Sequence, residues 1–122
     1  MTPDWRRIDH VQLCITPGSE ALAREFYGDV LGFDEVEKPD SLADSGSIWF
    51  RAGDIELHLG IDEADAGTST RHPAFEVGDL DTTRTYLEAY GVETLDETPI
   101  PGRERCTFRD PFGNRIELLE LE

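Results

Sequence analysis

Apolar and polar residues alternate along several short segments, which is the pattern of strands that bury one face. In residues 8–15, His10, Gln12 and Cys14 share one face, and most aliphatic side chains lie on the other. Residues 55–60 repeat the pattern, with Glu56 and His58 on one face and Leu57 on the opposite face. In each segment the apolar face is able to pack under a helix, and the polar face is left for water or a ligand.

Two segments instead carry apolar residues at steps of three and four, which predicts amphipathic helices. The first helix is expected over 20–31, with Ser19 as its N-cap and Gly32 after its end. The second is expected over 79–90, and Gly91 follows it as Gly32 follows the first.

The order strand-helix-strand-strand-strand therefore occurs twice. Strands are expected at 8–15, 33–36, 47–51 and 55–60, and again at 71–77, 92–95, 106–110 and 115–121. The stretch 62–70 has no apolar periodicity and is expected to be a linker. We predict one α+β domain over residues 1–122, built from two pseudo-symmetric β-α-β-β-β modules at about 6–61 and 71–122. The modules are expected to form a curved mixed sheet with the helices outside.

Two markers repeat at nearly the same interval. His10 and His72 are 62 residues apart, and Glu56 and Glu117, each inside the string IEL, are 61 apart. Such a repeat indicates a duplicated supersecondary unit. A pseudo-twofold relation would gather two imidazoles and two carboxylates around one point, so the sequence predicts a site for one divalent ion (Ni, Co, Zn, Mn or Fe) with positions open to a small-molecule substrate.

The charge balance narrows the possible partners. The net charge is −16, which argues against nucleic acid and anionic membrane surfaces as partners.

No apolar run is long enough to span a bilayer, and the N-terminus lacks the apolar core of a signal peptide, so a cytoplasmic protein is expected. Cys14 and Cys106 are expected to be reduced. One lysine against ten arginines, with 27 acidic residues, favours a halophilic source over a GC-rich genome alone.

In its sequence motifs the chain resembles the vicinal oxygen chelate superfamily. This superfamily includes glyoxalase I, extradiol dioxygenases, methylmalonyl-CoA epimerase, and fosfomycin and bleomycin resistance proteins. The resemblance covers nearly the whole chain and rests on five strings: IDHV at 8–11, FYGDVLGF at 26–33, IELHL at 55–59, RHPAFEV at 71–77 and DPFGNRIEL at 110–118. It implies paired β-α-β-β-β modules around a metal, commonly within a homodimer.

The resemblance also implies a role for individual residues. His10, Glu56, His72 and Glu117 match the four metal ligands of the bacterial type of glyoxalase I. If Glu56 stays off the metal, the other three resemble the two-His-one-carboxylate triad of extradiol dioxygenases and fosfomycin-modifying enzymes. His58 departs from the pattern: it is open to a place beside the metal, an acid-base role, or a place as a ligand instead of Glu56.

The function expected from this resemblance is that of a divalent-metal-dependent glyoxalase-like lyase or isomerase. It would chelate a small, oxygen-rich substrate through two oxygens while Glu56 or Glu117, assisted by His58, moves a proton. One alternative is an extradiol-type Fe(II) dioxygenase that uses His10, His72 and Glu117. The other is a metal-free dimer that binds a drug, as bleomycin resistance proteins do. Arg103 and Arg105, expected in a loop, are candidates to close over an anionic substrate.

Overall fold

The computed structural model describes residues 1–63 and 69–122 and divides the chain into two compact units, Met1–Asp62 and Glu63–Glu122. For comparison, the predicted modules span residues of about 6–61 and 71–122. Part of the predicted linker, residues 64–68, lies outside the described residues. The single domain over residues 1–122 stays a prediction.

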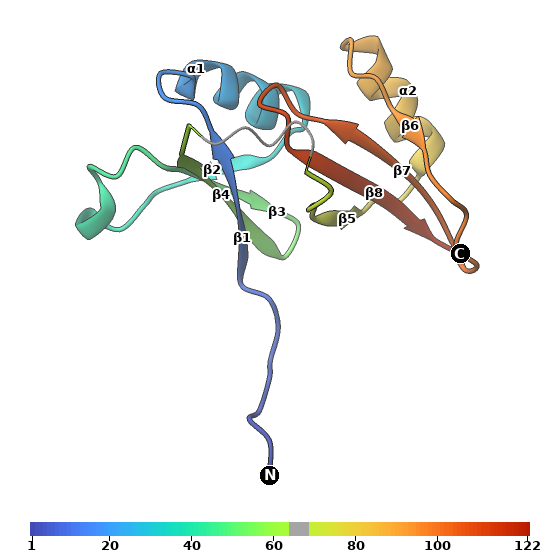
Figure 1. Ribbon diagram of the computed structural model, residues 1–122, viewed down its shortest axis with the longest axis horizontal. Helices are drawn as coiled ribbons and strands as arrows, with labels where there is room; N and C mark the ends of the chain where they lie inside the picture. Colours follow the sequence, from blue (N-terminus) through green and yellow to red (C-terminus); the bar gives the residue numbers. More distant parts are fainter. Residues whose placement is uncertain (64–68) are drawn as a thin grey trace. The chain divides into compact units, whose positions relative to one another are not determined.

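The first module contains a four-stranded mixed sheet and one helical segment (Figure 1). Its sheet has the strand order β1-β4-β3-β2, in which β1 runs parallel to β4 and the other neighbours are antiparallel. Its elements are β1 (His10–Ile15), α1 (Glu20–Ala23), the π-helical η1 (Arg24–Val30), β2 (Asp34–Val36), the 3-10 helix η2 (Asp40–Leu42), β3 (Ile48–Ala52) and β4 (Ile55–Ile61).

The second module repeats this order with the sheet β5-β8-β7-β6. Its elements are β5 (Ala74–Glu76), α2 (Leu80–Ala89), β6 (Leu95–Asp96), β7 (Arg103–Arg109) and β8 (Arg115–Leu121). The predicted α+β class with two β-α-β-β-β modules is confirmed, and the strands form two four-stranded sheets, one in each module.

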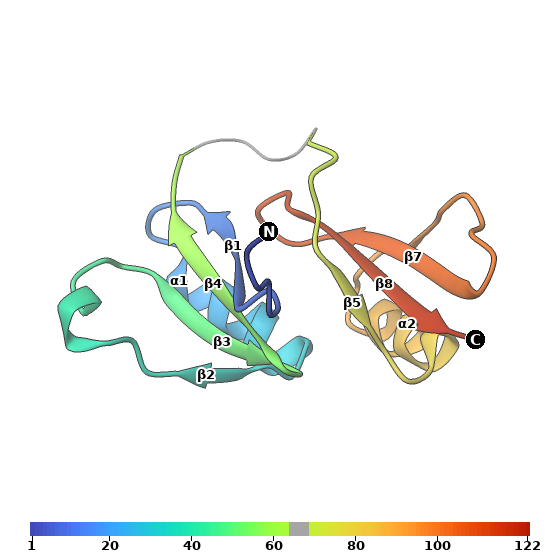
Figure 2. The same cartoon turned by 90° about the horizontal axis from the view of Figure 1, so that it is seen from below.

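Each helix covers one face of its own sheet (Figure 2). In the first module the rings of Tyr27 and Phe50 lie 6.1 Å apart, and Phe50 pairs with Leu57 across β3 and β4. All three side chains are buried. In the second module the corresponding apolar face buries Phe108, Ile116 and Leu118, with Leu80 and Leu87 buried on α2. The opposite face of each sheet therefore carries the polar residues that the alternation predicted.

The first strand of each module is shorter than expected. The β1 strand begins at His10 rather than Ile8, because its partner β4 begins at Ile55, directly after the Gly53–Asp54 turn. The β5 strand begins at Ala74 rather than at residue 71, because Pro73 has no N–H to donate to a ladder. His72 consequently lies just before a strand and not within one.

The start of the first helix also differs from expectation. Ser19 occupies the N-cap position, but its side chain makes no capping bond and its hydroxyl donates to the carbonyl of Thr16. The predicted helix over 20–31 is an α-helical turn that continues as the π-helical η1. In α2, by contrast, the Asp79 carboxylate accepts the backbone N–H of Thr82 at 2.8 Å.

The strands that follow α2 were misplaced by the sequence prediction. The N–H of Val92 donates to the carbonyl of Leu87, so this residue closes the helix end at Gly91, and β6 starts only at Leu95. The stretch with Arg103 and Arg105 is not a loop, because it forms the first half of β7. Pro101 and Gly102 lie directly before the first residue of that strand.

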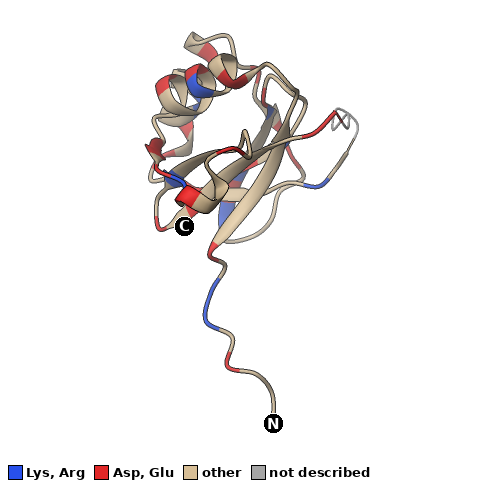
Figure 3. Cartoon of the chain, turned by 90° about the vertical axis from the view of Figure 1, so that its left-hand side faces the viewer, with Lys and Arg blue, Asp and Glu red and all other residues tan. Residues whose placement is uncertain are grey.

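Among residues 1–63 and 69–122, no helix is both long and apolar enough to cross a membrane. Acidic residues are spread along the chain, on helices as well as on connecting segments (Figure 3). Acidic residues therefore do not mark out a single element.

Candidate metal centre

The polar face of the first module brings His10, Glu56 and His58 together. His10 on β1 pairs with Glu56 on β4, and both lie on the face away from the helix. His58, two residues further along β4, shares this face, and its Nε2 lies 2.9 Å from Oε1 of Glu56. His58 is buried, whereas the side chain of Glu56 is 26% exposed.

Three aromatic rings form a stack on this face. The rings of Trp49 and His58 lie 3.8 Å apart and are nearly parallel, and those of His58 and His10 lie 4.2 Å apart. The stack runs across three adjacent strands, β3, β4 and β1. It restricts the rotation of the His58 ring, so the directions in which its two nitrogens point are set by packing.

Hydrogen bonds hold the polar groups around this stack. Oε2 of Glu56 accepts from a guanidinium N–H of Arg51 at 3.2 Å, so both carboxylate oxygens of Glu56 have partners within the module. Nδ1 of His10 lies 3.1 Å from the carboxylate of Asp9. This bond lowers the pKa of Asp9, and the positive charge of Arg7 lowers it further.

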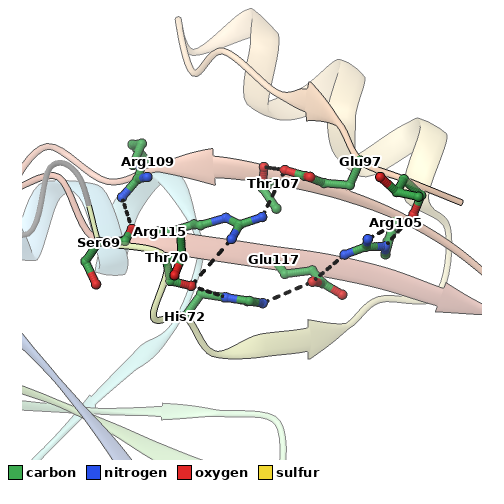
Figure 4. A network of polar contacts seen from close by, with 10 residues as sticks. Ser69, Thr70, His72, Glu97, Arg105, Thr107, Arg109, Arg115 and Glu117 are labelled. Carbon is green, nitrogen blue, oxygen red and sulfur yellow. Dashed lines mark hydrogen bonds and ion pairs between the residues drawn. The ribbon is translucent and has the colours of Figure 1, made fainter. Parts of the chain in front are cut away.

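The second module places His72 against Glu117 (Figure 4). Nε2 of His72 lies 3.1 Å from Oε1 of Glu117, and its Nδ1 lies 2.8 Å from the backbone carbonyl of Thr70. The same Glu117 oxygen accepts from Nη1 of Arg105 at 3.0 Å. Arg105 is itself fixed, because Nε and Nη2 both donate to the carbonyl of Thr98. The Glu117 side chain is only 8% exposed.

A second carboxylate network borders this pair. Glu97 accepts a short hydrogen bond from the hydroxyl of Thr107 and another from Arg115. These two bonds, together with the charge of Arg115, lower the pKa of Glu97. Thr107 pairs with Glu117 across β7 and β8, so Glu97 and Arg115 hold the strand that carries Glu117 in place.

The four predicted metal ligands appear as two pairs, one in each module. His72 contacts Glu117, and His10 faces Glu56 across two strands while its ring touches His58. Within the described residues, no group of three or more His, Cys, Asp and Glu side chains is placed to hold a metal ion. The four-ligand set remains a prediction after the structure.

Sequence reasoning missed two contacts of the site. Arg105 was expected in a loop, but it bonds directly to Glu117. Trp49 was not among the residues predicted for the site, yet it stacks on His58 on the polar face. Strand alternation could have identified Trp49, because Ile48 and Phe50 on either side of it are buried.

Arginines are concentrated on the polar face of the second sheet. The register places four of them on the Glu117 side of two adjacent strands: Arg103, Arg105 and Arg109 on β7 and Arg115 on β8. Nε of Arg103 is buried and has no hydrogen-bond partner among the described residues. This face therefore offers donors to an anion in a chain whose net charge is −16.

Cys14 and Cys106 are not joined by a disulfide. Burial raises the pKa of Cys106, which lies in the core of the second module, and burial also raises the pKa of Cys14. Both thiols are therefore poor nucleophiles near neutral pH.

Known proteins of similar sequence and structure bear on this site. A glyoxalase family protein from Bacillus anthracis shares 38% identity and superposes with a TM-score of 0.93, with all of both chains covered. The YaeR protein of Escherichia coli (strain K12), which is uncharacterised, is 29% identical over 126 residues, covering 94% of this chain and 96% of YaeR.

A more distant structure shares the fold alone. FosX, a fosfomycin resistance protein from Listeria monocytogenes crystallised with Mn(II) and sulfate, is 18% identical with a TM-score of 0.75. The alignment covers 98% of this chain and 93% of FosX. The family model described as Glyoxalase/Bleomycin resistance protein/Dioxygenase superfamily matches residues 7–118. With nearly the whole chain matched, the protein belongs to the Glyoxalase/Bleomycin resistance protein/Dioxygenase superfamily.

Proposed function

We propose that the protein is a divalent-metal-dependent enzyme, a lyase or isomerase, that acts on a small, oxygen-rich substrate. The observation that carries this proposal is the contact between His72 and Glu117. Nδ1 of His72 faces the carbonyl of Thr70, so a neutral ring donates from Nδ1 and presents its Nε2 lone pair to a carboxylate oxygen. In that form of the ring two acceptors lie 3.1 Å apart, an arrangement that a cation bound by both would stabilise.

The donor set fits such a cation. Bonds of about 2.1 Å from a metal to nitrogen and oxygen place two donors at a right angle about 3 Å apart. The Nε2 to Oε1 separation in the His72–Glu117 pair is 3.1 Å. We propose that His10, His72 and Glu117 bind the ion, with a fourth donor from β4, where the sequence predicts Glu56. A divalent ion held there would polarise a substrate oxygen as a Lewis acid.

Proton transfer belongs to the residues around that ion. Glu56 is more exposed than Glu117 and shares a hydrogen bond with His58. A carboxylate hydrogen-bonded to an imidazole can accept a proton from the carbon next to a carbonyl and return it to a neighbouring atom. Glu117 is less available for this step, because its side chain is only 8% exposed and it is proposed to bind the ion.

The arginines beside Glu117 favour a negatively charged substrate. Arg103 and Arg105 are two residues apart on β7, so their side chains point to the same face of the sheet as that of Glu117. The Nε of Arg103, buried without a partner among the described residues, would gain an acceptor if a carboxylate, phosphate or phosphonate oxygen reached it. We also propose that the protein acts as a homodimer, which light scattering in high salt would test.

The proposed function is tested by metal content and proton exchange together. We expect about one divalent ion per chain in protein purified without chelator, or after reconstitution with Ni, Co, Zn, Mn or Fe. With hemithioacetals of 2-oxoaldehydes in D2O, we expect deuterium in the product at the hydroxyl-bearing carbon next to the new thioester carbonyl.

A His72→Ala variant should lose both metal and exchange and serves as the matched control. If the native protein binds none of these ions, the enzyme proposal fails, and a metal-free ligand-binding dimer becomes the better account. If it binds iron and consumes O2 with a catechol but exchanges no proton, the dioxygenase alternative replaces it.

A further inference from the structure

His72 lies just before the strand ladder of the second module begins. The β5 strand starts at Ala74, which pairs with Glu117. Pro73, between His72 and the strand, has no N–H to donate. The His72 ring is nevertheless held on two sides, by the Thr70 carbonyl at 2.8 Å and by Glu117 at 3.1 Å. Bonds other than those of the ladder therefore fix where this ring lies.

Two arginines bind the segment that precedes His72 (Figure 4). Nη1 of Arg109 donates to the carbonyl of Ser69 at 2.9 Å, and Nη1 of Arg115 donates to the carbonyl of Thr70 at 3.4 Å. Arg109 is the last residue of β7, and Arg115 is the first residue of β8. The two side chains therefore fasten two consecutive carbonyls to the sheet of the second module.

Each of these arginines is itself anchored. Nη1 of Arg109 also donates to the carbonyl of Gly113, in the turn between β7 and β8, at 2.9 Å. Nη2 of Arg115 donates to Oε1 of Glu97 at 3.1 Å, and the same oxygen accepts from the hydroxyl of Thr107. The side chains of Arg115 and Glu97 are 19% and 23% exposed, so solvent screens their charges less than those of a pair on open surface. Both guanidinium groups are thus fixed from a second side.

The Thr70 carbonyl joins this network to the His72 ring. A carbonyl oxygen only accepts hydrogen bonds, so the ring nitrogen that faces it, Nδ1, carries a proton. That proton is present whether the ring is neutral or positively charged. With Nδ1 directed at Thr70, Nε2 is directed at Glu117. The position of one backbone carbonyl thus decides which nitrogen of His72 faces the carboxylate.

We propose that Arg109 and Arg115, the latter held by Glu97, are positioning residues for His72. By fixing the carbonyls of residues 69 and 70, they keep Nδ1 of His72 protonated and Nε2 directed at Glu117. They act through the backbone and not by contact with a substrate. The bearing of this role on catalysis rests on the proposed function, whereas all of the contacts lie within the second module.

The orientation of the ring is measured by ¹⁵N NMR of the full-length, metal-free protein labelled at histidine. The chain has three histidines, and His72→Gln identifies the signals of His72. In the native protein we expect a protected Nδ1 proton on His72, because its hydrogen bond slows its exchange with water. Arg109→Gln and Arg115→Gln should each speed that exchange by at least about tenfold, as for loss of a hydrogen bond from a charged group.

Arg84→Gln is the matched control in the same module. Arg84 also joins a carboxylate to a threonine carbonyl, those of Asp96 and Thr94, and its side chain is 24% exposed. It lies on α2, which covers the opposite face of the sheet. Its loss should therefore leave the Nδ1 proton of His72 unchanged, whatever its effect on the melting temperature.

Glu97→Gln is a second variant that keeps the question open to test if the arginine variants do not fold, which circular dichroism would reveal. It retains an acceptor for Thr107 but removes the negative charge beside Arg115. Exchange of the His72 proton should therefore be faster than in the native protein, though slower than in Arg115→Gln.

An unprotected Nδ1 in the native protein, or a proton on Nε2 of His72 alone, would overturn the positioning role. So would exchange that is unchanged in the arginine variants, or that Arg84→Gln speeds as much as Arg115→Gln does. Each of these results would leave the metal-dependent function standing. Absence of metal binding by the native protein would do the reverse, because the NMR measurement is made without metal.

Discussion

Glu56 and Glu117 lie in the same three-residue string but in different surroundings. Glu117 is 8% exposed and bonds to an arginine whose side chain is itself 16% exposed. Glu56 bonds to Arg51, whose side chain is 50% exposed. Solvent screens the second pair much more than the first, so the two carboxylates should differ in how strongly they depend on their arginines.

We therefore expect Arg105→Gln to lower the free energy of unfolding by about 2–3 kcal/mol, because it leaves a buried carboxylate short of a charged donor. Arg51→Gln, the matched control in the first module, should cost no more than about 1 kcal/mol. Urea denaturation followed by circular dichroism measures both. Equal losses would show that burial does not distinguish the two pairs.

At the scale of single elements, the two helices begin differently although both are preceded by a residue that often caps helices. The Asp79 side chain accepts the N–H of Thr82, whereas Ser19 bonds backwards to Thr16. The bond from the Thr82 backbone lowers the pKa of Asp79, with a smaller contribution from the Thr82 side chain. Only the second helix therefore gains stability from a charged cap.

This difference predicts a pH-dependent effect. A carboxyl with a lowered folded-state pKa stabilises the fold above its ordinary pKa, and this contribution disappears as the pH falls through the folded value. Asp79→Ala should lower the melting temperature by a few degrees at pH 7, and the difference from the native protein should shrink below about pH 4. Ser19→Ala should have little effect at any pH. A loss that is the same at pH 7 and pH 3 would contradict the role of the Asp79 charge.

The β7–β8 connection shows how a turn can fix the position of a site residue. The Asp110 carboxylate accepts the backbone N–H groups of Phe112 and Asn114 and the side-chain amide of Asn114. Asp110 is buried, so these bonds are shielded from water. They set the register in which Thr107 faces Glu117.

At the scale of the whole molecule, charge is the main property to test. The chain carries 27 acidic and 11 basic residues, and self-repulsion of this size opposes compaction at low salt. The Debye length falls from about 10 Å at 0.1 M salt to about 3 Å at 1 M. We expect the melting temperature to rise over that range of NaCl and then to level off. A flat curve would count against a halophilic origin and favour a GC-rich genome as the cause of the arginine excess.

The sequence by itself determined which strands and helices make up each module. The alternation of apolar and polar residues predicted the strands and their buried faces, because side chains on a strand point to opposite sides whatever the partner strand is. The duplication, the helices, Gly91 as a helix end and the polar face with His10, Glu56 and His58 all followed from such local rules. These features depend on chain geometry over a few residues, which the sequence contains directly.

Only the tertiary structure decided the pairing between strands. Glu56 pairs with His10, whereas Glu117 pairs with Ala74, two residues after His72. This difference depends on which backbone N–H meets which carbonyl, and β1 and β4 are some forty residues apart in the chain. The bonds from Arg105 to Glu117 and the stacking of Trp49 on His58 likewise join separate strands. Such contacts depend on the register between paired strands, and a repeated string of letters can suggest a different register from the one that the backbone adopts.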